Sequence, residues 1–373
     1  MAYTNIDDPS AYFQAFTYTG NGSNPRNLTN DGNSDLKPDL IWIKNRTDNG
    51  TDNVLANSTM GFDAPNAPNG GGQLSTNSSG GVNVPPSTYG YVSAALTNGF
   101  TAAAGGTNGD VANANGKEFV ACQWKANGGT TVSNTDGSIT TTVQANPTAG
   151  FSLVFYTGNG IQTGETVGHG LGAVPKMIIS KDRDGTSNVP TWRTYHEAIG
   201  ATKYLQMPQT DAESTFDDWD NTTPTSSVYS VGGSSGYTPA NTSNTEYIAY
   251  VFADVQGYSK FGSYVGNGST NGPFIYTGFK PAFVLFKNSS NAGENWIMYD
   301  HKRDPYNESF RELFPNSDIA EYTANAFDID ILSNGFKHRG ANTGSNGSAR
   351  EYIFMAFAEN PFVTSTGVPA CAR

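Results

Sequence analysis

The chain has 373 residues, a formal net charge of −12 at pH 7, and only 14% charged residues. No basic run occurs, which counts against nucleic-acid binding through phosphate contacts, and no apolar run is long enough for membrane insertion. The 43 glycines and the 12% aromatic residues favour many short strands joined by turns over helices.

Residues 1–12 form a polar lead with a turn signal at 7–10. The lead has neither the basic region nor the apolar core of a signal peptide. We therefore expect a protein that is made in a cytosol and either stays there or leaves by lysis or assembly.

Three copies of one pattern follow along the chain. The sequence Tyr-Thr-Gly-Asn-Gly at 18–22 recurs unchanged at 156–160 and with one change at 264–268. Aromatic and apolar residues precede each copy. This pattern predicts a strand that runs into a tight Asn-Gly hairpin, because Asn-Gly tolerates the positive φ angles of such a turn.

Two further features recur in the same order after each turn. A proline opens an apolar run that ends in lysine, and a charged residue later opens an aromatic-rich strand. The proline runs lie at 37–45, 174–181 and 280–288, and the closing strands lie at 117–124, 245–252 and 350–357. The constant order predicts three copies of one unit, each long enough to form a small domain with its own core.

The predicted fold class is all-β, with three tandem antiparallel β-sandwich domains. The domains span 13–129, 151–257 and 258–362, and a linker joins the first two at 130–150. This linker could still pair as a hairpin around Asp136-Gly137. The last residues, 363–373, are expected to form an extended tail that reaches a neighbouring molecule.

The middles of the units differ from one another. The first unit contains a long loop, 49–86, which is expected to be functional or covered by a neighbour. The second and third units share a Trp-x-x-Tyr pattern, at Trp192 and Trp296, which the first unit lacks. An alternating strand pair with an Asn-Gly-Phe turn, at 91–100, recurs at 327–336.

Motifs for catalysis and metal binding are missing from the sequence. The four histidines stand at no metal-ligand spacing, and neither a nucleophile elbow nor a phosphate-binding loop occurs. We predict no catalytic residue, no cofactor and no protein-ligated metal. Calcium is the alternative ligand, although no Asp-rich calcium loop supports it. Cys122 and Cys371 are expected to be a buried thiol and a free tail thiol.

Carboxylates leave a second functional class open. Asp328 and Asp330 would share one face of a strand, which suits the paired carboxylates of a glycan-cleaving enzyme as well as a solvated surface. In a chain of net charge −12 the solvated surface is the favoured interpretation.

Aromatic side chains could instead bind carbohydrate by stacking on sugar rings. Trp42, Trp192 and Trp296 fall in recurring strands and are therefore expected in the core. Trp219 lies in an acidic loop that the other units do not share. Together with Asp217 and Asp218 it is the predicted carbohydrate-binding site.

Taken together, these motifs resemble a repeated domain of marine bacteriophage structural proteins, common in phages of cyanobacteria and other marine bacteria. The resemblance is carried by the five-residue turn, the run at 38–46, Trp-x-x-Tyr-Asp at 296–300, Asn-Gly-Phe at 334–336 and the closing strand at 352–357. It covers nearly the whole chain. Such proteins are similar to tail fibre components with lectin-like, jelly-roll β-sandwich domains.

The resemblance implies a non-enzymatic virion protein that forms a homo-oligomer, with a trimer as the first expectation. Its partners would be other virion proteins and a host surface glycan. The favoured role is a tail-associated fibre or adhesin that contacts the host surface. A capsid decoration protein on the phage head is the first alternative, and a glycan depolymerase is the alternative from another class.

Overall fold

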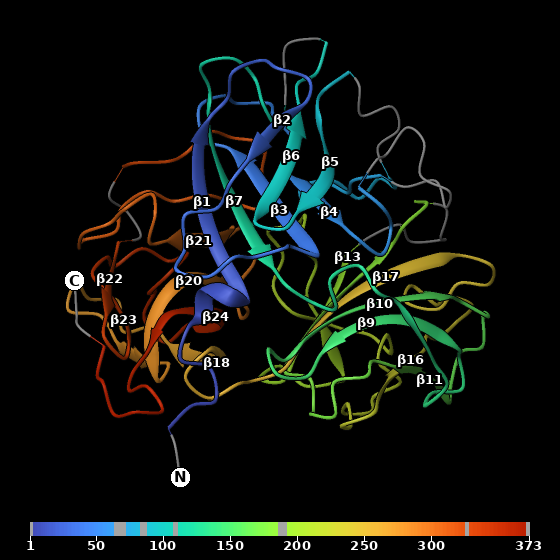
Figure 1. Cartoon of the computed structure of the whole chain (residues 1–373). Helices are drawn as coiled ribbons and strands as arrows, with labels where there is room; N and C mark the ends of the chain where they lie inside the picture. Colours follow the sequence, from blue (N-terminus) through green and yellow to red (C-terminus); the bar gives the residue numbers. More distant parts are fainter. Residues whose placement is uncertain are drawn as a thin grey trace.

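The computed structural model describes residues 3–62, 72–82, 88–106, 111–185, 192–324 and 328–370. These residues confirm the all-β prediction: they form antiparallel sheets and one short 3-10 helix, η1 (Pro9–Ala11). Three groups of strands surround a common centre, with the first repeat at the top of Figure 1, the second at the lower right and the third at the lower left.

Each repeat has its own large sheet, in which four equivalent strands follow the same spatial order. In the first repeat the order is β1 (Phe13–Thr19), β7 (Glu118–Trp124), β3 (Leu40–Asn45) and β4 (Val54–Asn57). In the second it is β10 (Phe151–Thr157), β17 (Glu246–Phe252), β12 (Met177–Asp182) and β13 (Trp192–His196). In the third it is β18 (Ser259–Val265), β24 (Glu351–Pro361), β20 (Phe279–Asn288) and β21 (Trp296–Asp300).

A smaller sheet belongs to each repeat. The strands are β2 (Arg26–Leu28), β6 (Gly99–Ala103) and β5 (Tyr91–Leu96) in the first repeat, and β11 (Glu165–Gly168) and β16 (Val228–Val231) in the second. They are β19 (Phe274–Tyr276), β23 (Gly335–His338) and β22 (Ile329–Leu332) in the third. Apolar side chains from the large and small sheets of each repeat form one buried cluster. The second repeat also holds a short pair, β14 (Lys203–Tyr204) and β15 (Ser214–Thr215).

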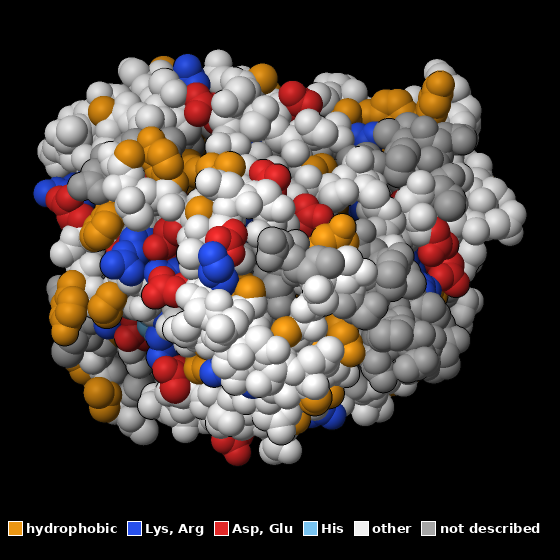
Figure 2. All heavy atoms as spheres, turned by 90° about the horizontal axis from the view of Figure 1, so that it is seen from above, with side chains coloured by type: hydrophobic (Ala, Val, Ile, Leu, Met, Phe, Trp, Pro, Cys, Tyr) orange, Lys and Arg blue, Asp and Glu red, His pale blue; other side chains and the backbone are white. Residues whose placement is uncertain are grey.

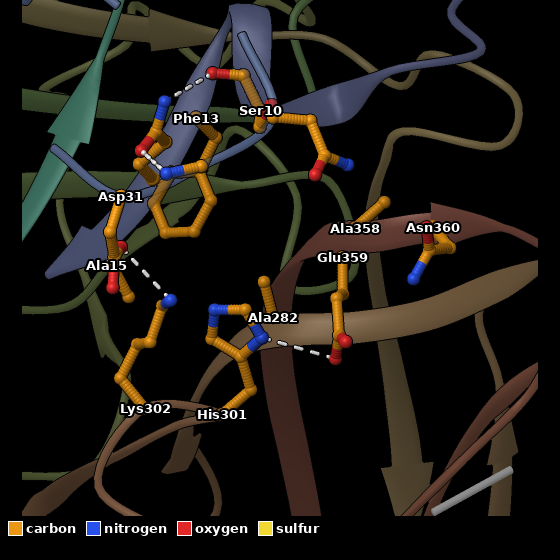
Figure 3. Close-up of a pocket in the computed structure, with 13 residues that line it drawn as sticks. Ser10, Phe13, Ala15, Asp31, Ala282, His301, Lys302, Ala358, Glu359 and Asn360 are labelled. Carbon is orange, nitrogen blue, oxygen red and sulfur yellow. Dashed lines mark hydrogen bonds and ion pairs between the residues drawn. The ribbon is translucent and has the colours of Figure 1, made fainter. Parts of the chain in front are cut away.

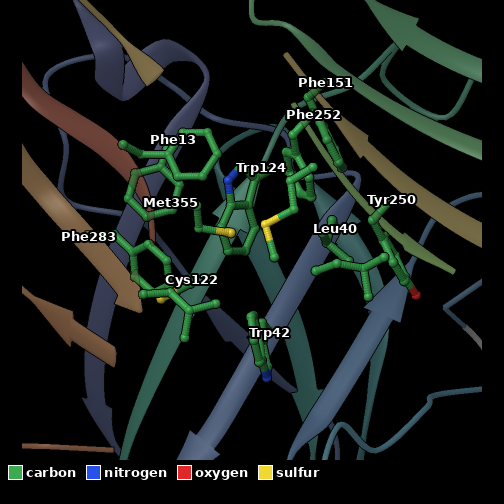
Figure 4. Close-up of a cluster of buried hydrophobic side chains, with 14 of the residues drawn as sticks. Phe13, Leu40, Trp42, Cys122, Trp124, Phe151, Tyr250, Phe252, Phe283 and Met355 are labelled. Atoms are coloured by element: carbon green, nitrogen blue, oxygen red, sulfur yellow. The ribbon is translucent and has the colours of Figure 1, made fainter. Parts of the chain in front are cut away.

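The other faces of the three large sheets meet in one shared core (Figure 4). Trp124, Phe252 and Phe357 occupy equivalent positions in the three closing strands. Their ring centroids form a triangle with sides of 6.5, 6.0 and 5.6 Å. The large sheets are therefore buried on both faces, and the repeats are arranged with approximate threefold symmetry around this triangle.

Backbone hydrogen bonds close the three repeats into a ring. In each repeat, a backbone N–H of a loop donates to the carbonyl of the residue that follows β3, β12 or β20 of the next repeat. The third repeat donates in this way to the first. The N–O distances are 2.8 Å from Val82 to Arg183, 2.8 Å from Glu213 to Ser289 and 2.9 Å from Glu321 to Arg46.

The segment predicted as a linker is part of the second repeat. β8 (Val132–Asn134) and β9 (Thr141–Asn146) pair with each other, and β9 pairs along β10. The hairpin around Asp136-Gly137 is thus confirmed, and the linker assignment is wrong. Alternating residues of β9, Thr141 and Val143, are buried, so the segment contributes to the fold instead of spacing two domains.

The Tyr-Thr-Gly-Asn-Gly motif does not form the predicted tight hairpin, because β1 and β2 belong to different sheets. A buried asparagine holds it instead. In the second repeat, Asn241 Oδ1 accepts from the Asn159 N–H at 3.0 Å, and Asn241 Nδ2 donates to Asn159 Oδ1 at 2.9 Å and to the Ile161 carbonyl at 2.8 Å. Tyr156 donates to the carbonyl of Ala240, next to this asparagine. Asn113 and Asn346 do the same in the first and third repeats.

The first glycine of the motif is required by this close approach. A Cβ atom at Gly158 would lie 2.3 Å from the Thr242 carbonyl oxygen, far inside van der Waals contact. The second glycine, Gly160, has a φ angle of 77°, which side chains disfavour. The recurring sequence therefore encodes a connection between two sheets.

The first and last described residues lie against the third repeat (Figure 1), where Tyr3 donates to the Gly278 carbonyl at 2.7 Å. Thr4 donates to the carbonyl of Gln256, at the end of the second repeat, at 2.8 Å, and the carboxylate of Asp7 accepts from Ser365 in the tail. The tail is not extended up to residue 370, because the Ala370 N–H returns to the Phe362 carbonyl at 2.9 Å. Cys371 lies outside the described residues.

Candidate functional site

Trp219, the predicted sugar-stacking residue, is buried. Its side chain is 1% exposed and packs edge-on against the rings of Tyr195 and Tyr229 at centroid distances of 5.8 and 6.3 Å. The prediction of an exposed stacking face at Trp219 is therefore wrong. The predictions for Trp42, Trp192 and Trp296 are confirmed, because all three lie in the shared core.

Asp217 and Asp218, which precede Trp219, both hold the acidic loop in place. Asp218 is buried and lies 3.4 Å from the guanidinium of Arg193 on β13. Burial raises the pKa of Asp218 to about 6, and Arg193 opposes that rise. Asp217 is half-buried and accepts from Asn221 at 2.9 Å. These contacts fix the acidic loop to the second repeat and leave no sugar site at Trp219.

Three buried lysines reach from one repeat into the preceding repeat of the ring. Burial lowers the pKa of Lys44, Lys181 and Lys287 to about 8, a change that often marks a reactive amine. Here each Nζ donates to a backbone carbonyl of another repeat. The Nζ–O distances are 2.9 Å from Lys44 to Ser317, 3.1 Å from Lys181 to Ser79 and 3.3 Å from Lys287 to Thr210. The three lysines thus link neighbouring repeats of the ring by hydrogen bonds.

The residue that lies across the sheet from each of these lysines makes a second hydrogen bond to another repeat. Trp192 donates through Nε1 to the Ser78 carbonyl at 2.9 Å, and Trp296 donates to the Gln206 carbonyl at 3.1 Å. Asn53 stands at this position in the first repeat and donates to the Pro315 carbonyl at 2.7 Å. This explains why the first repeat lacks the tryptophan. Of the predicted long loop, the described residues 72–82 thus contact the second repeat, whereas the described residues 49–62 contain β4.

A polar pocket of about 200 Å³ lies at the junction of the first and third repeats (Figure 3). His301 Nδ1 lies 3.1 Å from Glu359 Oε2, and Lys302 Nζ lies 2.9 Å from Asp31 Oδ1. The latter pair crosses from one repeat to the other. The charged side chains of this pocket pair with one another, so the pocket is a polar contact between the first and third repeats.

A second and wider hollow, of about 560 Å³, lies on the outside of the third repeat and is called here the rim groove. Its lining is Arg303, Asp304, Pro305, Tyr306, Asn307, Glu308, Phe310, Arg311 and Asp328. The ring of Tyr306 is 78% exposed. An exposed ring among carboxylates, an amide and a guanidinium offers both stacking and hydrogen bonds to a polar ligand.

Buried contacts hold the rim groove in shape. Arg303 donates through Nη1 to the Arg311 carbonyl at 2.7 Å and to Glu321 at 3.1 Å. Asp304 accepts from the backbone N–H of Arg311 at 2.8 Å. Asn307 exchanges two hydrogen bonds of 2.9 Å with the backbone of Ile331. The groove is thus preorganised by the fold.

Asp328 lines the rim groove, and Asp330 does not. Burial raises the pKa of Asp328, and the carboxylates of Glu308 and Asp304 add to the rise. Asp330 lies 3.4 Å from Arg339, on the outer face of β22. The carboxylate of Glu308 raises the pKa of both aspartates, but only Asp328 lines the groove. Phe327, which precedes them, lies outside the described residues.

The histidines of the described chain are dispersed. No group of three His, Cys, Asp or Glu side chains in 3–62, 72–82, 88–106, 111–185, 192–324 and 328–370 is placed to hold a metal ion. Within the same ranges no helix has the length and apolarity to span a bilayer. The face seen in Figure 2 is mostly uncharged, with cationic and anionic side chains next to one another.

Comparison with known proteins gives one match. A family model described as a domain of unknown function, DUF7483, matches residues 8–361. Neither a curated protein nor a solved structure matches the chain. The family match begins in the N-terminal lead and ends with β24, so it spans all three repeats.

Proposed function

This chain belongs to the DUF7483 family, and on that premise we propose that it is a non-enzymatic structural protein of a bacteriophage virion. In this proposal it is a tail-associated fibre protein or adhesin that contacts the host surface. It assembles as a homo-oligomer, most simply a trimer, on other virion proteins. The resemblance of its motifs to marine phage proteins supplies the setting.

The rim groove is the observation that carries the adhesin role. Its shape is set by the buried guanidinium of Arg303, while the ring of Tyr306 stays 78% exposed. A preformed polar groove with an exposed ring suits recognition of a surface ligand, since little ordering is lost on binding.

The copy number of the chain per particle tests this role. Quantitative mass spectrometry of purified particles, scaled to the major capsid protein, should give the low copy number of a tail component. The labelled protein should also bind host cells. A copy number in the hundreds would contradict the adhesin role and would support decoration of the capsid, where symmetry offers that many sites.

Asp328 favours a second function, glycan depolymerisation. A carboxyl group with a raised pKa beside other carboxylates in a groove has the properties of a general acid. If the groove cleaves glycans, incubation with host polysaccharide should release reducing sugar, and Asp328→Asn should abolish the release. Asp35→Asn, at an exposed aspartate of the first repeat, is the matched control. The adhesin role predicts no release from any of the three proteins.

A further inference from the structure

Two aromatic rings lie exposed on the outer face of the third repeat. Phe274 is 44% exposed and Tyr276 is 53% exposed, while Ile275 between them is buried. Side chains alternate along a strand, so both rings stand on the solvent face of β19, roughly 6.6 Å apart along the chain. We call this pair the aromatic shelf.

Glycines next to the aromatic shelf allow its two rings to pack close to the backbone. A Cβ atom at Gly335, on the neighbouring strand, would lie 3.0 Å from Cε2 of Phe274. One at Gly278 would lie 3.7 Å from Cε1 of Tyr276. Tyr3 fixes the second ring from the side, because its hydroxyl donates to the Gly278 carbonyl at 2.7 Å and lies 3.3 Å from the Tyr276 hydroxyl. Each ring thus covers backbone with one side and leaves area open to solvent.

A strip of hydrogen-bonding side chains runs from the aromatic shelf to the rim groove. Lys337 lies directly opposite Phe274 in the sheet, and Asp330 lies opposite Lys337. Arg339 then lies 3.4 Å from both Asp330 and Glu308, the latter in the groove wall. The strip thus begins at Phe274 and ends at Glu308, in the groove whose lining also includes Tyr306.

The other two repeats lack the aromatic shelf. In the first repeat the positions equivalent to Phe274 and Tyr276 are Asn27 and Thr29, both exposed, although the same glycine, Gly99, lies beside them. In the second repeat the equivalent strand is covered by the β8–β9 connection, where Ser138 donates to Thr166 Oγ1 at 2.9 Å. The internal copies show that the fold does not require rings at this place.

We propose that the aromatic shelf and the polar strip beside it bind a glycan chain built of pyranose rings. A pyranose has an apolar face of C–H groups that stacks on an aromatic ring, and a rim of hydroxyls that bonds to Lys337, Asp330 and Arg339. The shelf thus supplies the ligand class of the adhesin role, on which this inference rests.

The size and charge of the surface favour a glycan over other occupants. The two half-exposed rings offer on the order of 100 Å² each, far below the roughly 800 Å² per partner of a stable protein interface. The net charge of −12 and the carboxylates Asp330 and Glu308 disfavour nucleic acid and anionic membranes. A narrow ligand with apolar faces and many hydroxyls matches two rings and a polar strip.

An exchange of residues between repeats tests the inference. The double variant Phe274→Asn with Tyr276→Thr gives the third repeat the side chains of the first, which fold in this strand position. The matched control is Asn27→Ala with Thr29→Ala. Full-length fluorescent protein is applied to an array of bacterial O-chain and capsular polysaccharides, and its thermal unfolding is recorded. We expect binding by the natural chain and the control, and binding weaker by about tenfold or more in the exchange variant.

Equal glycan binding by the folded exchange variant would overturn the inference. If the exchange variant loses stability, the milder variant Phe274→Leu with Tyr276→Leu decides, because it keeps apolar side chains on β19 and removes the rings on which a pyranose stacks, so glycan binding should still fall. Failure of the natural chain to bind any polysaccharide also overturns the inference. In that case the adhesin role still stands if the chain binds host cells through a protease-sensitive receptor, and it falls if no cell is bound.

Discussion

His338 shows how a single side chain ties the stability of this fold to pH. It lies among the rings of Tyr264, Phe286 and Phe336, at centroid distances of 4.8, 5.2 and 5.7 Å. Neither ring nitrogen has a hydrogen-bond partner among the described residues. Burial lowers the pKa of His338 to about 3. The imidazole is therefore buried in its neutral form.

We predict that His338→Phe makes the free energy of unfolding less sensitive to acid. The folded-state pKa lies below the unfolded value of about 6.5, so the unfolded chain takes up the proton first as pH falls. Stability that is present above pH 6.5 is then lost on the way to pH 3, by up to about 1.4 kcal/mol per pH unit for this proton. Urea unfolding at stepped pH values should show a shallower acid limb in the variant.

Phe336→Leu is the control for this pH effect. It disturbs the same cluster without changing a titratable group, so it should lower stability by a similar amount at every pH. An acid limb that stays equally steep in His338→Phe would show that other groups set the acid sensitivity. His196, whose pKa burial lowers to about 4, would then be the next residue to change.

The tryptophans show what residue-level reasoning could and could not reach. Trp192 and Trp296 recur in equivalent strands, so comparison between repeats placed them in the core correctly. Trp219 has no counterpart in the other repeats, and three neighbouring aspartates suggested exposure. Its burial depends on the packing of Tyr195 and Tyr229, which lie on other strands of the second repeat and meet Trp219 only in the folded structure.

At the scale of the elements, the lysine-ending strands carry the contacts between repeats. Lys287 donates to the carbonyls of Asn288 and Glu294 at 2.9 Å, and to Thr210 of the second repeat at 3.3 Å. We predict that Lys287→Met lowers the free energy of unfolding by about 2–4 kcal/mol, because three carbonyls lose their donor. Denaturant unfolding measures the difference.

Lys260→Met is the matched control for this strand contact. Lys260 pairs with Asp254 at 2.6 Å at a half-exposed site, and such pairs contribute at most about 1 kcal/mol. A Lys287→Met protein as stable as the natural chain would mean that burying the ammonium costs as much as its three hydrogen bonds contribute. The lysine would then fix the geometry of the ring without stabilising it.

The strands that recur in the sequence are the best-predicted elements. Their positions follow from local periodicity, whereas the path after each Tyr-Thr-Gly-Asn-Gly depends on a residue about 80–90 positions away. That residue is the buried asparagine that hydrogen-bonds the motif, and the sequence does mark it. In each repeat it lies six positions before the first aromatic residue of the closing strand. The pairs are Asn113 and Phe119, Asn241 and Tyr247, and Asn346 and Tyr352.

At the scale of the whole molecule, the shared core should make the three repeats unfold together. We predict a single calorimetric transition whose calorimetric and van't Hoff enthalpies agree, although the chain contains three repeats. Phe357→Ala, in the central triangle, should shift that transition as a whole and lower stability by about 3–5 kcal/mol. Circular dichroism and tryptophan fluorescence should report the same midpoint.

Tyr237→Ala, at a half-exposed ring of the second repeat, is the control and should leave the midpoint nearly unchanged. Separate transitions, or a shift confined to part of the signal, would show that the repeats behave as independent domains. The recurrence of the strand motifs was visible in the sequence, but the core that they share was not. Its signal was the continuous apolar run of strands such as Leu40–Asn45, which indicates burial on both faces.

The closed ring also constrains how the protein is made. Lys44 is translated early, yet its acceptor carbonyl at Ser317 lies 273 residues further along the chain. At about 5–20 residues per second, the ribosome needs roughly 14–55 s to supply it. During that interval Lys44 has no acceptor at Ser317, and the apolar side chains of the first repeat that pack in the shared core lack their partners from the third repeat. The nascent chain therefore reaches its final state only when the last repeat is released, and any premature stop leaves the first repeat open to aggregation or degradation.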